Sequence, residues 1–345
     1  MLARELYTII SSEKSAYEFL ASKGLLTSAI DHPPCKKCGT STQLKTRKSK
    51  LKDGSIREYP SFRCPKRGCQ TYQSVRTSNG FFHYTDLNNK INCKLTLGQI
   101  IEMCYYWAYD YSVTAVCELT GRAESTVIDW FNLCRDIPVE LFRRRDKMGG
   151  PDCMFQIDES LLRGKRKYNR GRFRGGEVIL DQLDENDPNA ANIINSRNHG
   201  RRISGPWVFG ICYRTQHYDI DVVERRFFVV EKRDRATLIP IIQNEIEVGS
   251  TIHSDEWTAY SSLGRLGYLH ETVNHQEYFV DPHSGANTQL IECLWKHAKL
   301  KIISKMNGTS RDLLHRHLAE LWWRSLNPKD PFMAILRDIK LVFNS

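Results

Sequence analysis

The pattern of apolar and polar positions changes three times along the chain. Residues 1–30 carry apolar side chains at helical spacing, which predicts N-terminal helices. Residues 31–85 lose this spacing and contain short β-type stretches between many polar side chains. Helical spacing returns over 95–136, and from residue 152 strand and helix patterns alternate. The pattern therefore predicts several structural segments of different classes.

The segment 95–136 predicts three helices joined by short turns. The first includes Ile100, Cys104, Trp107 and Ala108, the second spans Val113–Leu119 before Thr120-Gly121, and the third spans about Glu124–Cys134. A helix, a short turn containing Gly and a second helix form the outline of a helix-turn-helix motif. A plain three-helix bundle gives the same pattern, so both interpretations stay open.

The segment 152–309 predicts an α/β domain with a mixed sheet flanked by helices. The expected strands are Met154–Asp158, Trp207–Tyr213, Phe227–Glu231, Thr251–Ser254 and Leu269–Val273, and the expected helices are about 235–247, Glu256–Leu266 and 287–305. Three strands followed by alternating helices and strands is the order of a ribonuclease-H-like domain. Residues 176–205 are rich in Asn, Asp and Pro and are expected to form a flexible insertion. Residues 310–345 predict C-terminal helices.

Four of the eleven cysteines have the spacing of a zinc ribbon. Cys35-x2-Cys38 is followed after 25 residues by Cys64-x4-Cys69, within the predicted ribbon 31–85. Two cysteine pairs on tight turns place four thiolates around a tetrahedral Zn²⁺. The alternative is two coincidental turns with free thiols. A segment with so few large apolar residues favours structural Zn²⁺, because metal binding supplies folding energy that a small core lacks.

Composition narrows the class of protein further. The 345 residues carry a net charge of +10, with ordinary globular composition. No apolar run approaches the ~18 residues that span a bilayer, and the N-terminus lacks the order of a signal peptide, so we expect a soluble intracellular protein. Residues 31–76 hold twelve Lys/Arg and three Asp/Glu, and 163–174 hold seven Lys/Arg and no acid. Charge focused in this way favours a polyanionic partner over solvated basic loops.

Three carboxylates are candidates for metal-assisted chemistry. Asp158 and Asp255 each end a predicted strand, and Glu292 lies on the helix that follows the last strand. Phosphoryl transfer with two divalent cations needs such oxygen ligands. By itself the trio is a weak signal in a chain with 40 acids, and exposed strand-end carboxylates are the alternative. Because successive strand residues point to opposite faces, Asp158 and the neighbouring Glu159 cannot both face one site.

From Gln156 onward the chain resembles Merlin-family transposases, the eukaryotic relatives of a bacterial insertion-sequence group. The matching stretches are Ile157–Ser160, Gly164–Arg172, Gly205–Gly210, Arg235–Ile242, Ile252–Tyr260, Thr272–His275, Phe279–Pro282 and Gly285–Trp295. Including the N-terminal helices and cysteine pairs, the resemblance covers about 1–325. Several motifs in the same order make it specific.

The resemblance implies a DDE triad formed by Asp158, Asp255 and Glu292. It implies two Mg²⁺ or Mn²⁺ ions, with Asp158 bridging both and the other two carboxylates holding one each. The family usually has His where Asn287 stands and Asn where Gln289 stands. Both positions precede the glutamate by about one turn. His275 matches a family motif, and its role stays open between structural and catalytic.

The resemblance also implies double-stranded DNA as the partner, including element ends and target. The basic residues expected to contact DNA are Lys165, Arg166, Lys167, Arg170 and Arg172 after the first strand, and Lys296 and Lys299 on the face of Glu292. A solvated helix face is the alternative for the two lysines. Because two ends must be brought together, a homodimer or higher oligomer is expected, and the family implies nuclear localisation.

The resulting hypothesis is a cut-and-paste DNA transposase. The ribbon and helix-turn-helix would bind terminal inverted repeats. The ribonuclease-H-like domain would hydrolyse the ends and transfer the freed 3′-hydroxyl to target DNA. The alternative is a domesticated or inactive derivative that binds DNA without cutting it. The intact trio favours the enzyme, whereas Asn287 and Gln289 mildly favour the derivative.

Overall fold

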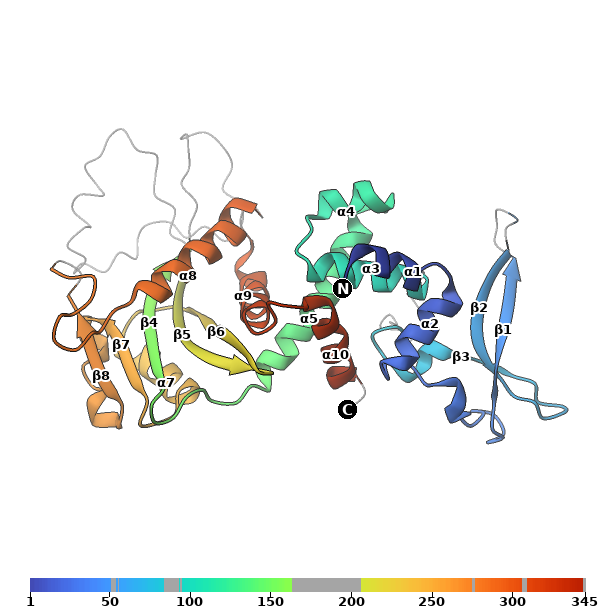
Figure 1. Ribbon diagram of the computed structural model, residues 1–345, viewed down its shortest axis with the longest axis horizontal. Helices are drawn as coiled ribbons and strands as arrows, with labels where there is room; N and C mark the ends of the chain where they lie inside the picture. The colour runs from blue at the N-terminus through green and yellow to red at the C-terminus, as the bar shows by residue number, and fades with distance from the viewer. Residues whose placement is uncertain are drawn as a thin grey trace. The chain divides into compact units, whose positions relative to one another are not determined.

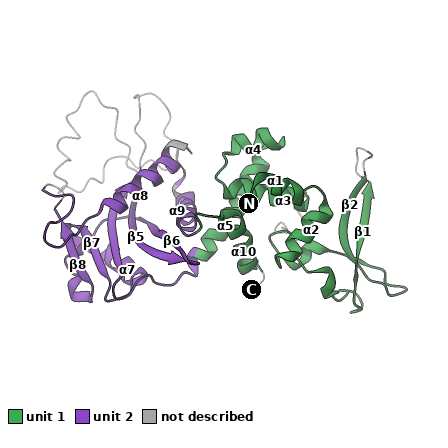
Figure 2. Ribbon diagram, in the orientation of Figure 1, with its two compact units in different colours: residues 1–141, 327–345 green, residues 142–326 purple. Residues whose placement is uncertain are grey.

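The computed structural model describes residues 1–50, 54, 56–83, 93, 95–162, 206–274, 277–305 and 309–343. The chain forms two compact units (Figure 2). One unit comprises residues 1–141 with 327–345, and the other comprises residues 142–326. None of the described helices is long and apolar enough to cross a membrane. Each unit is described by itself below.

The unit 142–326 is built on a mixed five-stranded sheet, as the sequence predicts (Figure 1). Its strands are β4 (Met154–Leu161), β5 (Trp207–His217), β6 (Ile220–Val230), β7 (Thr251–Asp255) and β8 (Leu269–Val273), in the order β6-β5-β4-β7-β8. The pairs β4–β5 and β5–β6 are antiparallel, whereas β4–β7 and β7–β8 are parallel. Consequently β4, β6, β7 and β8 all run in one direction, and their carboxyl ends meet at one edge of the sheet.

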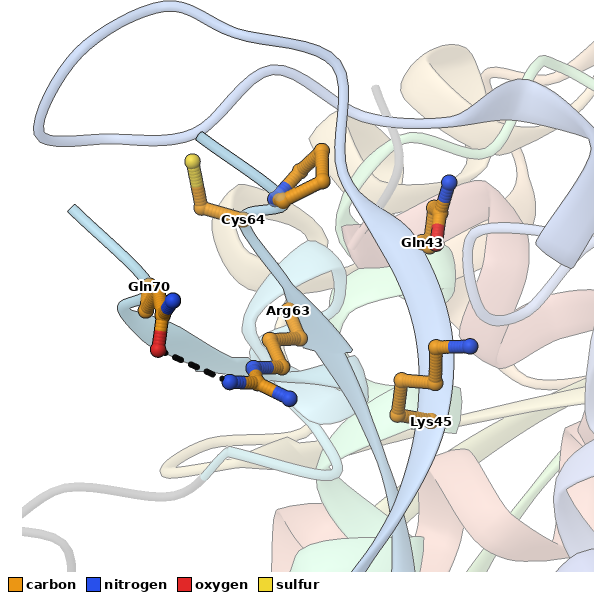
Figure 3. Close-up of a pocket in the computed structure, with 6 residues that line it drawn as sticks. Gln43, Lys45, Arg63, Cys64 and Gln70 are labelled. Carbon is orange, nitrogen blue, oxygen red and sulfur yellow. Dashed lines mark hydrogen bonds between the residues drawn. The ribbon is translucent and has the colours of Figure 1, made fainter. Parts of the chain in front are cut away.

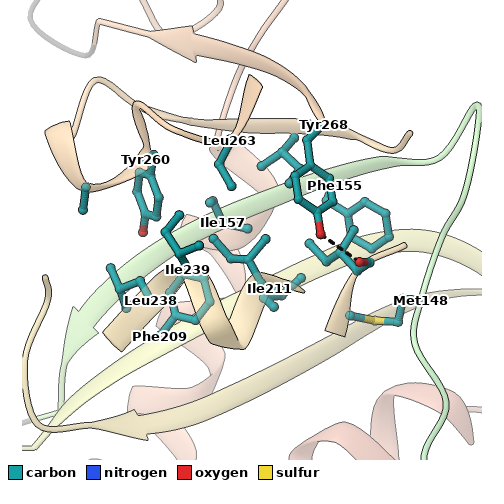
Figure 4. Packing of buried hydrophobic residues seen from close by; sticks show 14 of the residues in the cluster. Met148, Phe155, Ile157, Phe209, Ile211, Leu238, Ile239, Tyr260, Leu263 and Tyr268 are labelled. Carbon is teal, nitrogen blue, oxygen red and sulfur yellow. Dashed lines mark hydrogen bonds between the residues drawn. The ribbon is translucent and has the colours of Figure 1, made fainter. Parts of the chain in front are cut away.

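Helices cover both faces of this sheet, because both faces of its strands are apolar. The helices are α7 (Arg235–Glu245), α8 (Gln289–Lys299) and α9 (Arg311–Leu326). Figure 4 shows the core on the α7 side, where Leu238 and Ile239 pack with Phe155, Ile157 and Phe209 of the strands. On the opposite face, the core joins strand and helix residues, namely Val208, Cys212, Phe227, Ile291, Leu294, Trp295, Leu314, Leu318 and Leu321. Fully burying each such side chain contributes about 1.5–3 kcal/mol.

Two predicted helices differ in the structure. The stretch predicted as the helix Glu256–Leu266 forms two short 3₁₀ turns, Thr258–Tyr260 and Gly264–Leu266. The stretch contains adjacent serines and a glycine, which favour turns over α-helix, and Gly267 ends it at a φ of 91°. The long helix predicted over 287–305 is α8, continued by a π-helical turn at Leu300–Lys305.

The other unit combines helices with a three-stranded antiparallel sheet. Its elements are α1 (Ala3–Ile9), α2 (Glu13–Ser22), β1 (Gln43–Lys50), β2 (Ile56–Arg63), β3 (Tyr72–Ser74), α3 (Leu97–Ala108), α4 (Val113–Thr120), α5 (Glu124–Arg143) and α10 (Pro331–Phe343). Helix α4 ends at Gly121, whose φ of 64° provides the left-handed cap. The ring of Phe332 in α10 contacts Tyr105 of α3, with centroids 5.5 Å apart. The C-terminal segment therefore supplies α9 to one unit and α10 to the other.

A single carboxylate joins three parts of this unit. Glu13 of α2 accepts the backbone N–H of Leu97 at 2.7 Å, at the start of α3. Its other oxygen pairs with Arg57 of β2 at 3.3 Å and Arg76 at 3.2 Å. The Glu13 side chain is 10% exposed. These contacts fix the first turn of α3 to the small sheet, because a carboxylate at a helix N-terminus satisfies otherwise unpaired N–H groups.

Candidate active site and metal centre

The carboxyl edge of the large sheet carries two of the three predicted carboxylates. Asp158 lies on β4, and Asp255 is the last residue of the adjacent parallel strand β7. Glu292 lies in the first turn of α8. The negative charges of Asp255 and Glu292 both raise the pKa of Asp158, so the three carboxylates interact electrostatically. The structure thus places the three predicted residues around one edge.

The structure decides which member of the Asp158–Glu159 pair faces α8. The indole Nε1 of Trp295, on α8, donates to Asp158 Oδ2 at 2.9 Å. Glu159 instead accepts a hydrogen bond from the hydroxyl of Tyr260, on the opposite face. At the second strand end, Asp255 Oδ1 accepts the backbone N–H of Trp257 at 3.1 Å, whereas Glu256 is exposed. Asp158 and Glu292 therefore share a face.

A glycine makes the contact between Asp158 and Trp295 feasible. Gly210 of β5 lies opposite Asp158 in the sheet. A Cβ at this position would lie 2.6 Å from the Trp295 ring and 3.0 Å from Phe227. Trp295 and Phe227 stack with centroids 4.5 Å apart. Any larger residue at 210 would displace the indole that binds Asp158.

Burial and like charges make this a site suited to a cation. Burial is the main cause that raises the pKa of Asp158 from its ordinary value of 3.8 to about 6, and a hydrogen bond from the Glu159 backbone N–H opposes the rise. Burial likewise raises the pKa of Glu159 to about 7. A divalent cation would favour the ionised form of such carboxylates.

The three carboxylates are spaced more widely than the ligands of a closed metal site. Within the described ranges, three or more His, Cys or acidic ligand atoms lie within 4.8 Å of one another only at the cysteine cluster. Mg²⁺ retains several waters and is commonly held by one or two carboxylates together with substrate phosphates. The carboxylate edge fits that second mode, in which the substrate completes the coordination.

Gln156 connects the strand of Asp158 to the helix of Glu292, and sequence reasoning missed it. The side chain is 4% exposed. Its Oε1 accepts the backbone N–H groups of Leu290 at 2.9 Å and Ile291 at 3.1 Å, at the start of α8. Its Nε2 donates to Asn287 Oδ1 at 2.8 Å. A polar residue two positions before Asp158, hence on the same strand face, was the available signal.

Replacing Gln156 with leucine should destabilise the protein by about 1–3 kcal/mol. The substitution leaves two helix N–H groups and the Asn287 amide without their buried partner. Urea unfolding would measure the loss. The control Gln289→Leu, at the exposed first residue of α8, should change stability by less than about 0.5 kcal/mol. Equal effects of the two substitutions would contradict this role of Gln156.

The positions that depart from the family pattern have separate environments. Asn287 is half-buried, and besides its contact with Gln156 its Nδ2 donates to the carbonyl of Gly285 at 3.1 Å. Gln289 is exposed.

Lys296 is exposed and Lys299 half-buried, one and two turns beyond Glu292 on α8. The predicted DNA-contacting residues 165–172 and His275 lie outside the described residues.

The four cysteines of the predicted ribbon come together. The Sγ atoms of Cys35, Cys38, Cys64 and Cys69 all lie within 4.8 Å of one another. Cys35 and Cys69 are 3.7 Å apart, and Cys38 and Cys64 are 3.5 Å apart. Four thiolates bound tetrahedrally to Zn²⁺ at ~2.3 Å are ~3.8 Å apart. The Thr71 hydroxyl is the main group that lowers the pKa of Cys35 to about 6, which favours the thiolate. The cluster therefore fits a structural Zn²⁺.

One face of the ribbon sheet concentrates positive charge beside the cysteines. Lys45 and Arg47 of β1 share this face with Arg63 of β2 and Tyr72 of β3. The guanidinium carbons of Arg47 and Arg63 lie 5.1 and 5.5 Å from the centre of the Tyr72 ring. A hollow of about 240 Å³ lies alongside (Figure 3), lined by Gln43, Lys45, Arg63, Cys64, Pro65 and Gln70. Arg63 donates to Gln70 Oε1 at 2.9 Å across it.

Comparison with known proteins identifies the family of the unit 142–326. The ISXO2-like transposase domain matches residues 156–325, from β4 to α9. An uncharacterized transposase-like protein of Haemophilus influenzae is 31% identical over 99 residues, which cover 29% of this chain and 78% of that protein. The chain belongs to the ISXO2-like transposase family. The match confirms the transposase resemblance predicted from sequence, and the ISXO2-like domain contains all three candidate carboxylates.

Proposed function

We propose that this ISXO2-like transposase is a cut-and-paste DDE enzyme of the Merlin type. The observation that carries the proposal is the placement of Asp158 and Asp255 on two adjacent parallel strands, with Glu292 on the helix that contacts Asp158. Bound Mg²⁺ or Mn²⁺ would activate the attacking oxygen and stabilise the leaving oxygen. The strand order, three antiparallel strands followed by parallel ones, supports a ribonuclease-H-like fold.

The protein's own residues would hold and orient the reacting groups. The Trp295 indole and the Glu159 N–H each donate to one oxygen of Asp158, which fixes the orientation of that carboxylate. Thr288 Oγ1 donates to Glu292 Oε1 at 3.1 Å and fixes the second. Preorganised ligands of this kind lower the cost of reaching the transition state. Water would attack in the first step and the freed 3′-hydroxyl in the second.

A strand-transfer assay tests the proposal. The protein would be incubated with Mg²⁺, a plasmid, and duplexes carrying the ends of the element with exposed 3′-hydroxyls. We expect covalent joining of duplex to plasmid, since the proposed second step starts from such ends. Joining of both ends at one plasmid site would support the expected homodimer or higher oligomer. Nuclear localisation stays a prediction of the resemblance.

The zinc ribbon and the helices α3–α5 are proposed to bind the element ends. Support comes from the basic face of β1 and β2, and from the short turn at Gly121 between α4 and α5, which suits a helix-turn-helix. An exposed aromatic ring flanked by guanidinium groups is typical of nucleic-acid surfaces. Merlin-type activity and these DNA contacts remain parts of the proposal.

Replacing Arg47 or Arg63 with glutamine should weaken DNA binding and its salt dependence. Each lost phosphate contact lowers the slope of log K against log salt by about 0.9. Fluorescence anisotropy with a labelled duplex at several salt concentrations would measure this slope. Lys48→Gln is the matched control, because Lys48 lies on the opposite face and pairs with Glu58 at 2.6 Å. An unchanged slope in both arginine variants would exclude this face as the DNA contact.

A further inference from the structure

Arg233 lies at the carboxyl edge of the large sheet, in the connection between β6 and α7. Its guanidinium carbon is 3.9 Å from the ring centre of Trp207 and 5.3 Å from that of Trp257. The Trp257 indole N–H also donates to the Arg233 backbone carbonyl at 3.1 Å. Two tryptophans therefore hold this half-buried arginine in place.

Across the part of the chain that the structure describes, the Arg233 guanidinium has no carboxylate within ion-pair distance and no hydrogen-bond acceptor. Other arginines of the same unit differ. Arg145 pairs with Glu245, and Arg226 pairs with Glu224 at 2.8 Å. Stacking on aromatic rings uses the flat faces of a guanidinium and leaves its N–H groups available at the edges. Arg233 is thus a positioned cation with available donors.

The two tryptophans place this cation at the carboxyl edge of the sheet, on the α7 face that also holds Glu159. Trp257 is two residues after Asp255 and donates its backbone N–H to that carboxylate. Trp207 lies opposite Leu161 in the sheet and packs on the α7 face, whereas Asp158 faces α8. The positive charge of Arg233 also acts on the carboxyl group of Glu159. Arg233 is therefore anchored through Trp257, which also binds Asp255, and lies on the opposite face of the sheet from Asp158.

We propose that Arg233 binds a backbone phosphate of the DNA, adjacent to the bond that the carboxylates address. The inference rests on the proposed function and adds a phosphate site to it. The planar fork of a guanidinium suits two oxygens of one phosphate. A fixed cation at this edge would offset the repulsion between the phosphate backbone and the carboxylates. Arg233 would then position the DNA strand and takes no part in proton transfer.

Phosphate-specific substitution tests the site. A series of duplexes would be prepared, each with one neutral methylphosphonate at a different position. Binding of the protein to each duplex would be measured in buffer without added divalent cation. We expect one position, next to the cleavage site, where the neutral group weakens wild-type binding about 3–10-fold, as loss of a single hydrogen-bonded contact would. With Arg233→Ala, a methylphosphonate at that position should no longer weaken binding. The slope of log K against log salt should fall by about 0.9.

Two further variants separate the site from general effects. Arg235→Ala removes an exposed charge two residues away and should keep the methylphosphonate penalty. Arg233→Lys should keep the salt slope, because it retains the charge. Unfolding curves would show that each variant is folded.

The inference is overturned if Arg233→Ala keeps both the penalty and the wild-type slope. Because binding is measured without catalysis, a protein that binds but does not cut DNA would refute the proposed chemistry and leave the phosphate site standing.

Discussion

Asp158→Asn is expected to abolish metal-dependent DNA cleavage and, at neutral pH, to make the protein more stable. Loss of a carboxylate that holds the catalytic cations removes several kcal/mol of transition-state stabilisation, which lowers the rate about a thousand-fold or more. The gain in stability has a separate cause. Ionising a carboxyl group whose pKa is raised to about 6 by burial costs free energy in the folded state.

The sign of the pH dependence follows from this shift. Below the ordinary value of 3.8, Asp158 is protonated in both the folded and the unfolded protein, so it carries no penalty. As the pH rises toward about 6, the unfolded chain ionises first and folding loses free energy. We therefore expect Asp158→Asn to stabilise the protein by about 1–2 kcal/mol at pH 7 and to leave stability unchanged at about pH 3.

Thermal unfolding without added divalent cation would measure both effects. The matched control is Asp219→Asn, an exposed aspartate in the turn between β5 and β6, at the opposite edge of the sheet. It should leave cleavage and stability unchanged. Stabilisation of Asp158→Asn that persists at about pH 3 would contradict the assigned role of the buried charge.

Serine substitution of Cys64 is expected to remove bound zinc and unfold the ribbon. Cys64 and Cys35 are buried, and among the described residues of β1, β2 and β3 Phe62 is the only large buried apolar side chain. Zinc binding in comparable small folds contributes roughly 10 kcal/mol at neutral pH, which a three-cysteine site does not recover. We therefore expect loss of one zinc per chain and a weakening of DNA binding.

Metal analysis and near-ultraviolet circular dichroism would test this prediction. Cys153→Ser is the control, because this half-buried thiol belongs to the other unit and not to the cluster. The control should retain the zinc content and DNA affinity of the wild type. A Cys64→Ser protein that kept a full equivalent of zinc would exclude the four-cysteine centre.

Local sequence patterns predicted the strands and most helices of the unit 142–326, because apolar runs and helical spacing are properties of single segments. The face of the sheet to which each side chain points was harder to predict. Helices cover both faces of the sheet, so both faces carry apolar residues and no polar face distinguishes one from the other. The pattern around Asp158 therefore does not show which face holds the site. The assignment of Asp158 to the α8 face depends on Trp295, 137 positions away.

The residues that sequence reasoning missed act through partners distant in the chain. Gln156 binds the start of α8, Gly210 provides space for Trp295, and Arg233 stacks between two tryptophans. None has a local motif, since each depends on how separate elements pack. The same reason explains α9 and α10, which are both helical by pattern but pack in different units.

The most direct test of the central claim is cleavage of DNA that carries the element's own ends. Wild-type protein, Asp158→Asn and Glu292→Gln would be incubated with such DNA in Mg²⁺ or Mn²⁺, and the 3′ ends mapped. The account predicts metal-dependent nicking at the element ends by the wild type and none by either variant. Tight, salt-sensitive binding without nicking would contradict it and would favour a derivative that only binds DNA, with Asn287→His the first substitution to examine for restored activity.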